Sequence, residues 1–380
     1  MYNVSKLAGL MALLALAAAA WFSVLLARAD AAFRKGTPEG VARAVDLAPR
    51  NTAYLSLHAL QVEYDGGDPR PLLQEIARIN PDASAPRIRL GFDAEVRGDL
   101  PDAERWLLEA ARVDRQYEPR WALANFYFRR QRMNDFWTWL RSALEVSYGG
   151  RAAAFDLAWA AAPDPRTVLA RAIPERHDVF AAYLTYLLGG KRQAAAPVAE
   201  RLSQWRDPAD LPALYTALDA LVESGDRPAA RQIWINLGYP EPAAAVFNPD
   251  FGPLRIGHGF DWRFIQSPGV SHVLLDPLAL RISFSGMQPE SCELLRQYAG
   301  VDAGRRYVLR WESRGIANGI EWRIGKATAP LLAAAEWTPS RLPFVATQDT
   351  GALALFYHRP VGEPRVEGSV ELRHVMIEPE

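Results

Sequence analysis

The chain has 380 residues, with 43 Lys and Arg against 44 Asp and Glu, so its formal net charge is −1. This balance excludes the strongly basic composition of a dedicated nucleic-acid binder, and no nucleic-acid partner is expected. One cysteine, Cys292, excludes an internal disulfide framework.

A run of 21 residues without a charge, Leu7–Ala27, lies near the start of the chain. As a helix it would reach about 31 Å, enough to cross a bilayer core of about 30 Å. Two interpretations of residues 1–29 stay open. The length of the run favours an uncleaved transmembrane anchor, because a signal peptide has an apolar core of about 7–15 residues. The small-x-small spacing of Ala27-Arg28-Ala29 favours a cleaved signal peptide.

Three later segments end alike, at AVDLAPRN (44–51), IARINPDA (76–83) and AARVDRQY (110–117). Gly-Asp pairs recur at Gly67-Asp68, Gly98-Asp99 and Gly225-Asp226. Each unit therefore predicts a helix, a Gly-Asp turn and a second helix. Because such a hairpin cannot bury its apolar face alone, the units are expected to stack into an α-solenoid over residues 30–242.

This period and these endings resemble the tetratricopeptide repeat. The best unit, residues 84–117, matches the repeat pattern at Leu90, Gly91, Ala103 and Ala110, with Arg115 in place of the closing proline. The next unit keeps Trp121 and Phe128 but lacks the Gly-Asp turn. The likeness is good over residues 50–150.

The resemblance implies a concave surface that binds a partner protein, lined by the first helix of each unit. Carried over by position, the lining residues are Asn51, Tyr54, His58, Gln61, Phe92, Glu95, Phe126, Arg129 and Arg130. Aromatic and arginine side chains in a groove suit an extended partner segment. The alternative is that Phe92 and Phe126 pack between helices or beneath the C-terminal domain.

After a linker at Tyr239–Pro242, alternation with a period of two dominates residues 247–380. Apolar residues fall on one face of each of five runs: Leu278–Phe284, Tyr307–Trp311, Ile320–Ile324, Leu353–Tyr357 and Val370–Ile377. The last run contains a phase slip. Many short strands with one apolar face predict two packed antiparallel sheets, a β-sandwich.

The order of landmarks resembles the galactose-binding-like jelly-roll modules that are common among carbohydrate-binding domains. The landmarks are the turn Phe247–Phe251, Trp262, the strand Leu280–Phe284, Gln297, Gly304, the strand Tyr307–Trp311, Trp337 and the strand Gly368–Leu372. Many such modules hold a structural calcium ion through acidic residues, where this chain has Gly252 and Arg373-His374. Calcium needs anionic oxygen ligands, so no metal is expected.

Aromatic faces stack on sugars, and Trp262 and Trp337 are the candidate glycan-binding residues. Trp311 and Trp322 lie on the apolar faces of their predicted strands and are expected in the core. For Trp262 and Trp337 the alternative is also packing in the core or between domains.

Neither a histidine metal motif nor a nucleophile elbow, phosphate loop or dinucleotide fingerprint occurs in the sequence. Cys292 follows Ser291 without a discernible base partner. We expect no enzymatic activity, no cofactor and no metal.

The whole order of parts resembles that of uncharacterised bacterial membrane-anchored proteins. It implies a non-catalytic scaffold of the cell envelope, anchored in the inner membrane by a single pass, with its soluble part in the periplasm. The basic residues on the two flanks, Lys6 against Arg28, Arg34 and Lys35, do not decide the orientation. The alternative function is a tethered polysaccharide-binding protein that uses the C-terminal sandwich.

Overall fold

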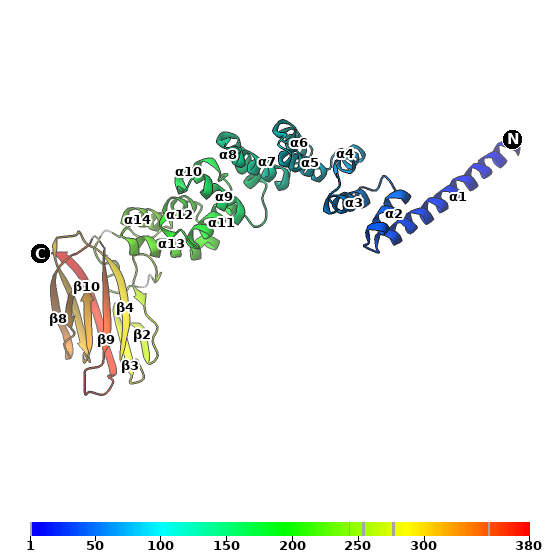
Figure 1. Ribbon diagram of the computed structural model, residues 1–380. Coiled ribbons are helices and arrows are strands. Elements are labelled where there is room, and N and C mark those ends of the chain that lie inside the picture. Colours follow the sequence, from blue (N-terminus) through cyan, green and yellow to red (C-terminus); the bar gives the residue numbers. More distant parts are fainter. Residues whose placement is uncertain (1, 243, 253–254, 276–277, 349) are drawn as a thin grey trace. The chain divides into compact units, whose positions relative to one another are not determined.

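The computed structural model describes residues 2–242, 244–252, 255–275, 278–348 and 350–380. Helices form the N-terminal region and strands the C-terminal region (Figure 1), which confirms the predicted fold class. The chain divides into two compact units. One holds the residues up to Ala162 together with Ala170–Pro174, and the other holds Pro163–Leu169 and Glu175–Glu380.

The first helix, α1 (Tyr2–Phe33), is continuous over 32 residues. Its segment Ala8–Phe33 is long and apolar enough to cross a membrane, and it contains an 18-residue stretch with a mean hydropathy of 2.4. The helix continues past the uncharged run that ends at Ala27. In this last part Ala29 is fully buried, in a cluster with Ala44, Ala48 and Tyr54.

Eight further helices of the first unit follow, and each contacts the next along the chain. They are α2 (Pro38–Leu47), α3 (Thr52–Tyr64), α4 (Arg70–Ile79), α5 (Ala85–Val96), α6 (Leu100–Val113), α7 (Tyr117–Arg129), α8 (Met133–Glu145) and α9 (Ala152–Ala161). Small residues at the helix crossings permit this close packing. A β-carbon at Gly91 would lie 2.7 Å from Leu107 Cγ, so α5 and α6 approach closely there.

The predicted Gly-Asp turns are present, and one hairpin forms without such a pair. Between α5 and α6, Gly98 adopts a φ of +82° and the Asp99 carboxylate caps α6 by accepting a hydrogen bond from Asp102 N. Between α7 and α8, Gln131 adopts a φ of +56° at the position equivalent to Gly98. The missing glycine therefore changes the energy of the turn and leaves its geometry intact.

The remaining helices are α10 (Pro165–Arg171), α11 (His177–Leu188), α12 (Ala196–Ser203), α13 (Leu211–Ser224) and α14 (Arg227–Asn236), with short 3₁₀ turns at Arg192–Ala194 and Pro208–Asp210. The predicted starts at Asp164 and Asp207 are confirmed, because each carboxylate accepts a hydrogen bond from a backbone N–H of the following turn.

Ten strands form the C-terminal sandwich: β1 (Arg263–Phe264), β2 (Val270–Leu275), β3 (Ala279–Ser285), β4 (Ser291–Gly300), β5 (Arg306–Gly315), β6 (Ile320–Ile324), β7 (Ala327–Pro330), β8 (Ala334–Val345), β9 (Thr350–His358) and β10 (Glu367–Pro379). They make two five-stranded sheets, in the orders β1-β4-β9-β6-β7 and β2-β3-β10-β5-β8. Every assigned strand pair is antiparallel.

The predicted strand faces are confirmed for β5 and β6, and the prediction was wrong at Leu278. Trp311 and Trp322 lie in the core between the sheets, whereas Leu278 lies just before β3 and is exposed. The predicted phase slip is a β-bulge in β10, where His374 adopts a φ of +52°. The His374 N–H donates a 2.9 Å hydrogen bond to Asp250, so the turn predicted at 247–251 holds the bulge.

Helix α13 packs on the sandwich inside the second unit. The Asp219 carboxylate accepts hydrogen bonds from the Gly259 N–H and from Arg263 of β1, each at 2.7 Å. Glu223, one turn later, accepts a 2.9 Å hydrogen bond from the Tyr298 hydroxyl of β4. The last helical hairpin is therefore an integral part of this unit.

Candidate functional site

The outer face of the sheet that contains β9 carries a trough. Along β9, Leu353, Leu355 and Tyr357 point into the core, so the alternate residues Ala352, Ala354 and Phe356 face outward. Alanine side chains at two successive outward positions keep the floor low, and the Phe356 ring stands at one end.

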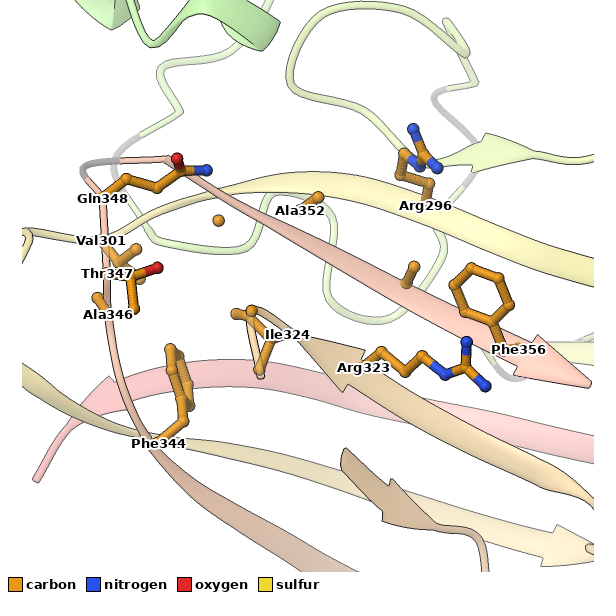
Figure 2. A pocket seen from close by; sticks show the side chains of 13 residues that line it. Arg296, Val301, Arg323, Ile324, Phe344, Ala346, Thr347, Gln348, Ala352 and Phe356 are labelled. Carbon is orange, nitrogen blue, oxygen red and sulfur yellow. The ribbon is translucent and has the colours of Figure 1, made fainter. Parts of the chain in front are cut away.

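The walls of the trough come from the strands on either side. Arg296 of β4 and Arg323 of β6 are both paired in register with Ala354. Because neighbouring strands lie about 4.8 Å apart, the backbones of the walls are about 10 Å from each other, wide enough for one extended chain. Figure 2 shows Arg296 on one side of β9 and Arg323 on the other.

A cavity of about 300 Å³ follows this trough to the loop after β8. Its lining residues are Arg296, Val301, Arg323, Ile324, Gly325, Phe344, Ala346, Thr347, Gln348, Gly351, Ala352, Ala354 and Phe356. Polar side chains therefore occur at both ends of an apolar floor.

Each wall carries its own ion pair. Arg296 donates two hydrogen bonds to Glu293, at 2.6 and 2.5 Å, and this carboxylate raises the pKa of Arg296. Arg323 pairs with Glu321 at 2.6 Å, and its guanidinium carbon lies 4.2 Å from the centre of the Phe356 ring. The four charged groups sum to zero, so the walls offer both hydrogen-bond donors and acceptors to a neutral ligand.

A second surface lies on the helical array. Phe92, Glu95 and Val96 of α5 and Arg129 and Arg130 at the end of α7 line a shallow depression of about 500 Å³. Phe92 and Val96 are 41% and 87% exposed, although both are apolar. Four of the nine predicted lining residues meet here.

The Glu95 carboxylate fixes the polar side of this depression. Its side chain is 10% exposed and accepts hydrogen bonds from Arg129, at 2.9 and 2.6 Å, and from Arg130 at 3.1 Å. The Arg129 hydrogen bond is the main reason that the pKa of Glu95 lies below its usual value, and burial opposes it. Two guanidinium groups against one carboxylate leave one positive charge beside the exposed apolar side chains.

Three other predicted lining residues have structural roles, which corrects their assignment to the groove. Asn51 caps α3, where its side chain accepts hydrogen bonds from the backbone. Tyr54 is 7% exposed and its ring lies 4.6 Å from that of Phe33. Phe126 is 2% exposed, so the packing alternative holds for Phe126 and not for Phe92. His58 and Gln61 are half-buried on α3 and do not line the depression.

The structure separates the two candidate glycan-binding tryptophans. Trp262 is 1% exposed, and its Nε1 donates a 2.9 Å hydrogen bond to Asn248 O, so its ring is core and its assignment to a glycan site was wrong. Trp337 is half-exposed on β8, in the other sheet from the trough. The guanidinium carbons of Arg314 and Arg373 lie 4.7 and 4.3 Å from the centre of its ring.

The trough residues Arg296, Arg323 and Phe356 were not among the sequence-predicted sites. A weak signal was present, since Ala352 and Ala354 alternate with large apolar residues, and Glu321 and Arg323 alternate with Ile and Trp. Such patterns fit any solvated sheet face. Only the register of β4, β9 and β6 brings these positions together.

No protein-family profile and no curated protein matches the chain. Among solved structures, a protein entitled "CBM4 structure and function" is similar at 12% identity over 32% of this chain and 88% of its own, with a TM-score of 0.24. The tetratricopeptide protein YrrB, described as having an unusual peptide-binding site, is similar at 12% identity over 53% of this chain and 92% of its own, with a TM-score of 0.27. The apo form of BiXyn10A CBM1 is similar at 14% identity over 32% of this chain and 98% of its own, with a TM-score of 0.23. These TM-scores are too low to indicate a function.

Proposed function

We propose that this protein is a non-catalytic, membrane-anchored binding protein whose sandwich holds one neutral polysaccharide chain along β9. The observation that carries the proposal is the register that places Arg296 and Arg323 opposite each other across Ala354. The resulting trough is one chain wide, has a flat apolar floor and is open to hydrogen bonds from both walls.

The chemistry of the walls favours uncharged sugar. Sugar hydroxyls both donate and accept hydrogen bonds, and each Arg–Glu pair supplies both functions from a fixed position. A carboxylate or sulfate on the ligand would lie close to Glu293 or Glu321 as well as to an arginine. Repulsion by the glutamate would offset the attraction to the arginine, so an anionic sugar would bind no better than a neutral one. The apolar faces of sugar rings match the alanine floor and the edge of Phe356.

The test is glycan binding by the full chain in detergent. We expect Arg296→Ala and Arg323→Ala each to weaken binding about tenfold or more, because each leaves a carboxylate without its partner and removes a set of donors. Ala354→Trp should abolish binding by filling the floor. Arg310→Ala is the matched control, since Arg310 pairs with Glu378 on the other sheet.

Two results would overturn this proposal. One is a folded protein that retains no neutral glycan, and the other is equal loss of binding in Arg310→Ala and Arg323→Ala. Hydrolysis of a retained glycan would contradict the non-catalytic part. The state of Cys292 supports the proposal that the protein is not an enzyme. Burial raises the pKa of the Cys292 thiol, and the hydrogen bond of the Ser267 hydroxyl lowers it by a smaller amount. The thiol therefore stays protonated and is a weak nucleophile.

A second function, binding of a partner protein by the helical array, is favoured by the depression on α5 and α7. Exposed Phe92 and Val96 offer apolar contact beside one net positive charge, which suits a peptide with an apolar and an acidic side chain. Replacing both with serine should remove capture of such a peptide without lowering the melting temperature. Unchanged capture would exclude the depression as the binding surface.

The anchor is proposed to stay uncleaved. Cleavage after Ala29 would remove that fully buried side chain from its cluster and leave only the last four residues of α1. The intact mass of the protein recovered from membranes tests this, and a mass that lacks residues 1–29 would refute it. We further propose an inner-membrane location in a bacterial envelope with a periplasmic array and sandwich, tested by digestion with protease added to spheroplasts.

A further inference from the structure

The anchor helix does not end where its uncharged run ends. The run stops at Ala27, but α1 continues without a break to Phe33, six residues and about 9 Å further. A helix that crosses a bilayer with Leu7–Ala27 therefore carries its last two turns directly out of the apolar core. No flexible segment separates the membrane-spanning part from the start of the array.

The next helix runs back along this emerging part. The chain reverses between Phe33 and Pro38, and a β-carbon at Gly40 would lie 2.6 Å from Ala32 O, so α2 touches α1 there. Ala44 and Ala48, each one turn further along, share the buried cluster of Ala29. Ala48 therefore lies about 12 Å back from Gly40, level with residues 24–25 of α1.

The exposure of α1 agrees with this position. Leu25 is half-buried, whereas its neighbours Val24 and Leu26 are 54% and 42% exposed. The covered part of α1 thus begins inside the uncharged run. The end of α2 and the segment before α3 consequently lie at the level where the run leaves the apolar core, which is the level of the lipid headgroups.

Two arginines stand at this level. Arg28 follows the uncharged run, and Arg50 lies between α2 and α3; both are exposed. In the part of the chain that the structure describes, neither forms an ion pair within 4.0 Å, although Arg50 lies near Glu75, whose pKa is lowered mainly by the Arg78 hydrogen bond and to a smaller extent by Arg50. Of the other charges in residues 28–50, Arg34 pairs with Asp30 at 2.7 Å and Arg43 lies 4.0 Å from Asp46, and exposed Lys35 and Glu39 are of opposite sign. Two positive charges remain, facing a surface rich in phosphate.

We propose that the first helix pair docks on the bilayer surface and that Arg28 and Arg50 bind the phosphate groups of anionic phospholipids. This inference rests on the proposed membrane anchor. The start of the array is then a lipid-binding surface. This contact fixes the orientation of the array relative to the membrane. Arginine is suited to this contact because its guanidinium binds phosphate with two parallel hydrogen bonds.

The experiment reconstitutes the full chain, carrying Cys292→Ser and a fluorophore on Pro49→Cys, into vesicles with and without phosphatidylglycerol. Quenching by a headgroup-linked nitroxide lipid reports docking. We expect strong quenching only in the anionic vesicles, and an about thirtyfold fall in the docked-to-undocked ratio for Arg28→Gln with Arg50→Gln. Arg112→Gln with Arg115→Gln is the matched control, because both arginines are exposed elsewhere on the array.

The outcomes distinguish failure of the proposed docking from failure of the proposed membrane anchor. Quenching that is equal in both vesicle types, or unchanged in the Arg28 and Arg50 double variant, would overturn the docking while the protein stays in the vesicles. Release of the protein by an alkaline wash would overturn the anchor and the docking together. Equal losses in the control double variant would assign the effect to net charge and overturn the specific contact.

Discussion

Asp219 of α13 and Arg263 of β1 form an ion pair with an N–O distance of 2.7 Å, and it joins the last helical hairpin to the sandwich. The same carboxylate accepts the Gly259 N–H, and its second oxygen lies 2.8 Å from His258 Nδ1. The two side chains of the ion pair are 25% and 16% exposed, so water competes weakly with this contact. One acidic side chain thus holds residues 258–259 and the first residue of β1 against α13.

Replacing Asp219 with asparagine should therefore destabilise the second unit by about 1–3 kcal/mol, the range for a charged hydrogen bond that loses its partner. Urea unfolding of the full chain in detergent measures this change. The control is Glu241→Gln, whose pair with Arg231 is about half exposed and should contribute less than about 1 kcal/mol. Equal effects of the two substitutions would show that Asp219 has no special role.

Gln131→Gly should stabilise the array. Gln131 holds a φ of +56°, a conformation in which a β-carbon is strained and glycine is not. We expect a gain of about 0.5–1 kcal/mol, measured by urea unfolding followed by circular dichroism. The reverse change at the equivalent turn, Gly98→Gln, should cost about 1 kcal/mol, because Gly98 has a φ of +82° and open space around it. A loss of stability in Gln131→Gly would contradict this view of the turn.

Stability in acid should depend on Glu371 of β10. Burial raises the pKa of this carboxyl group, but hydrogen bonds from Arg281 and Arg314 outweigh it, and the pKa lies below the ordinary value of 4.5. A depressed native pKa stabilises the fold fully above the unfolded value, and this contribution is lost as the pH falls through the native pKa. Glu371→Gln should therefore destabilise the protein at pH 7, with a difference from the parent that shrinks below about pH 4.5.

The measurement is the free energy of unfolding of both proteins at several pH values from 7 to 3. A difference that stays constant over this range would show that the charge of Glu371 does not stabilise the fold. Glu378→Gln is a suitable control, since Glu378 is 54% exposed on the same strand and pairs with Arg310 at 3.1 Å.

Trp262 and Trp337, the two candidate glycan-binding residues of the sequence analysis, should contribute differently to the stability of the fold. Trp262→Ala should cost about 3–5 kcal/mol, because it empties a fully packed core position beside Phe251 and Trp322. Trp337→Ala should cost only about 1 kcal/mol, the worth of its contacts with two guanidinium groups. Thermal unfolding of both variants measures the difference, and a mild effect of Trp262→Ala would refute its place in the core.

Local sequence patterns were sufficient to predict which regions are helical and which form strands. A helix, a turn and a strand face depend on neighbours within a few residues, so the uncharged run of α1, the Gly98-Asp99 turn and the alternation in β5 could be predicted correctly. The bulge at His374 was visible as a phase slip for the same reason. The hairpin of α7 and α8 adopts the same geometry as the neighbouring hairpins although its turn has no glycine. Packing of α7 on α8 outweighs the backbone strain at Gln131.

Which side chains share a surface depends on contacts between distant segments and could not be predicted from local patterns. Arg296, Ala354 and Arg323 meet because β9 inserts between β4 and β6, an order that no local pattern encodes. Phe92 and Phe126 occupy comparable repeat positions, yet one is 41% exposed and the other 2%, because exposure depends on which neighbouring helix covers the ring. Trp262 lies in a loop outside the strands, yet its ring is buried in the core against Phe251 and Trp322. Periodicity reports local geometry, whereas a site is made by pairing between segments far apart in the chain.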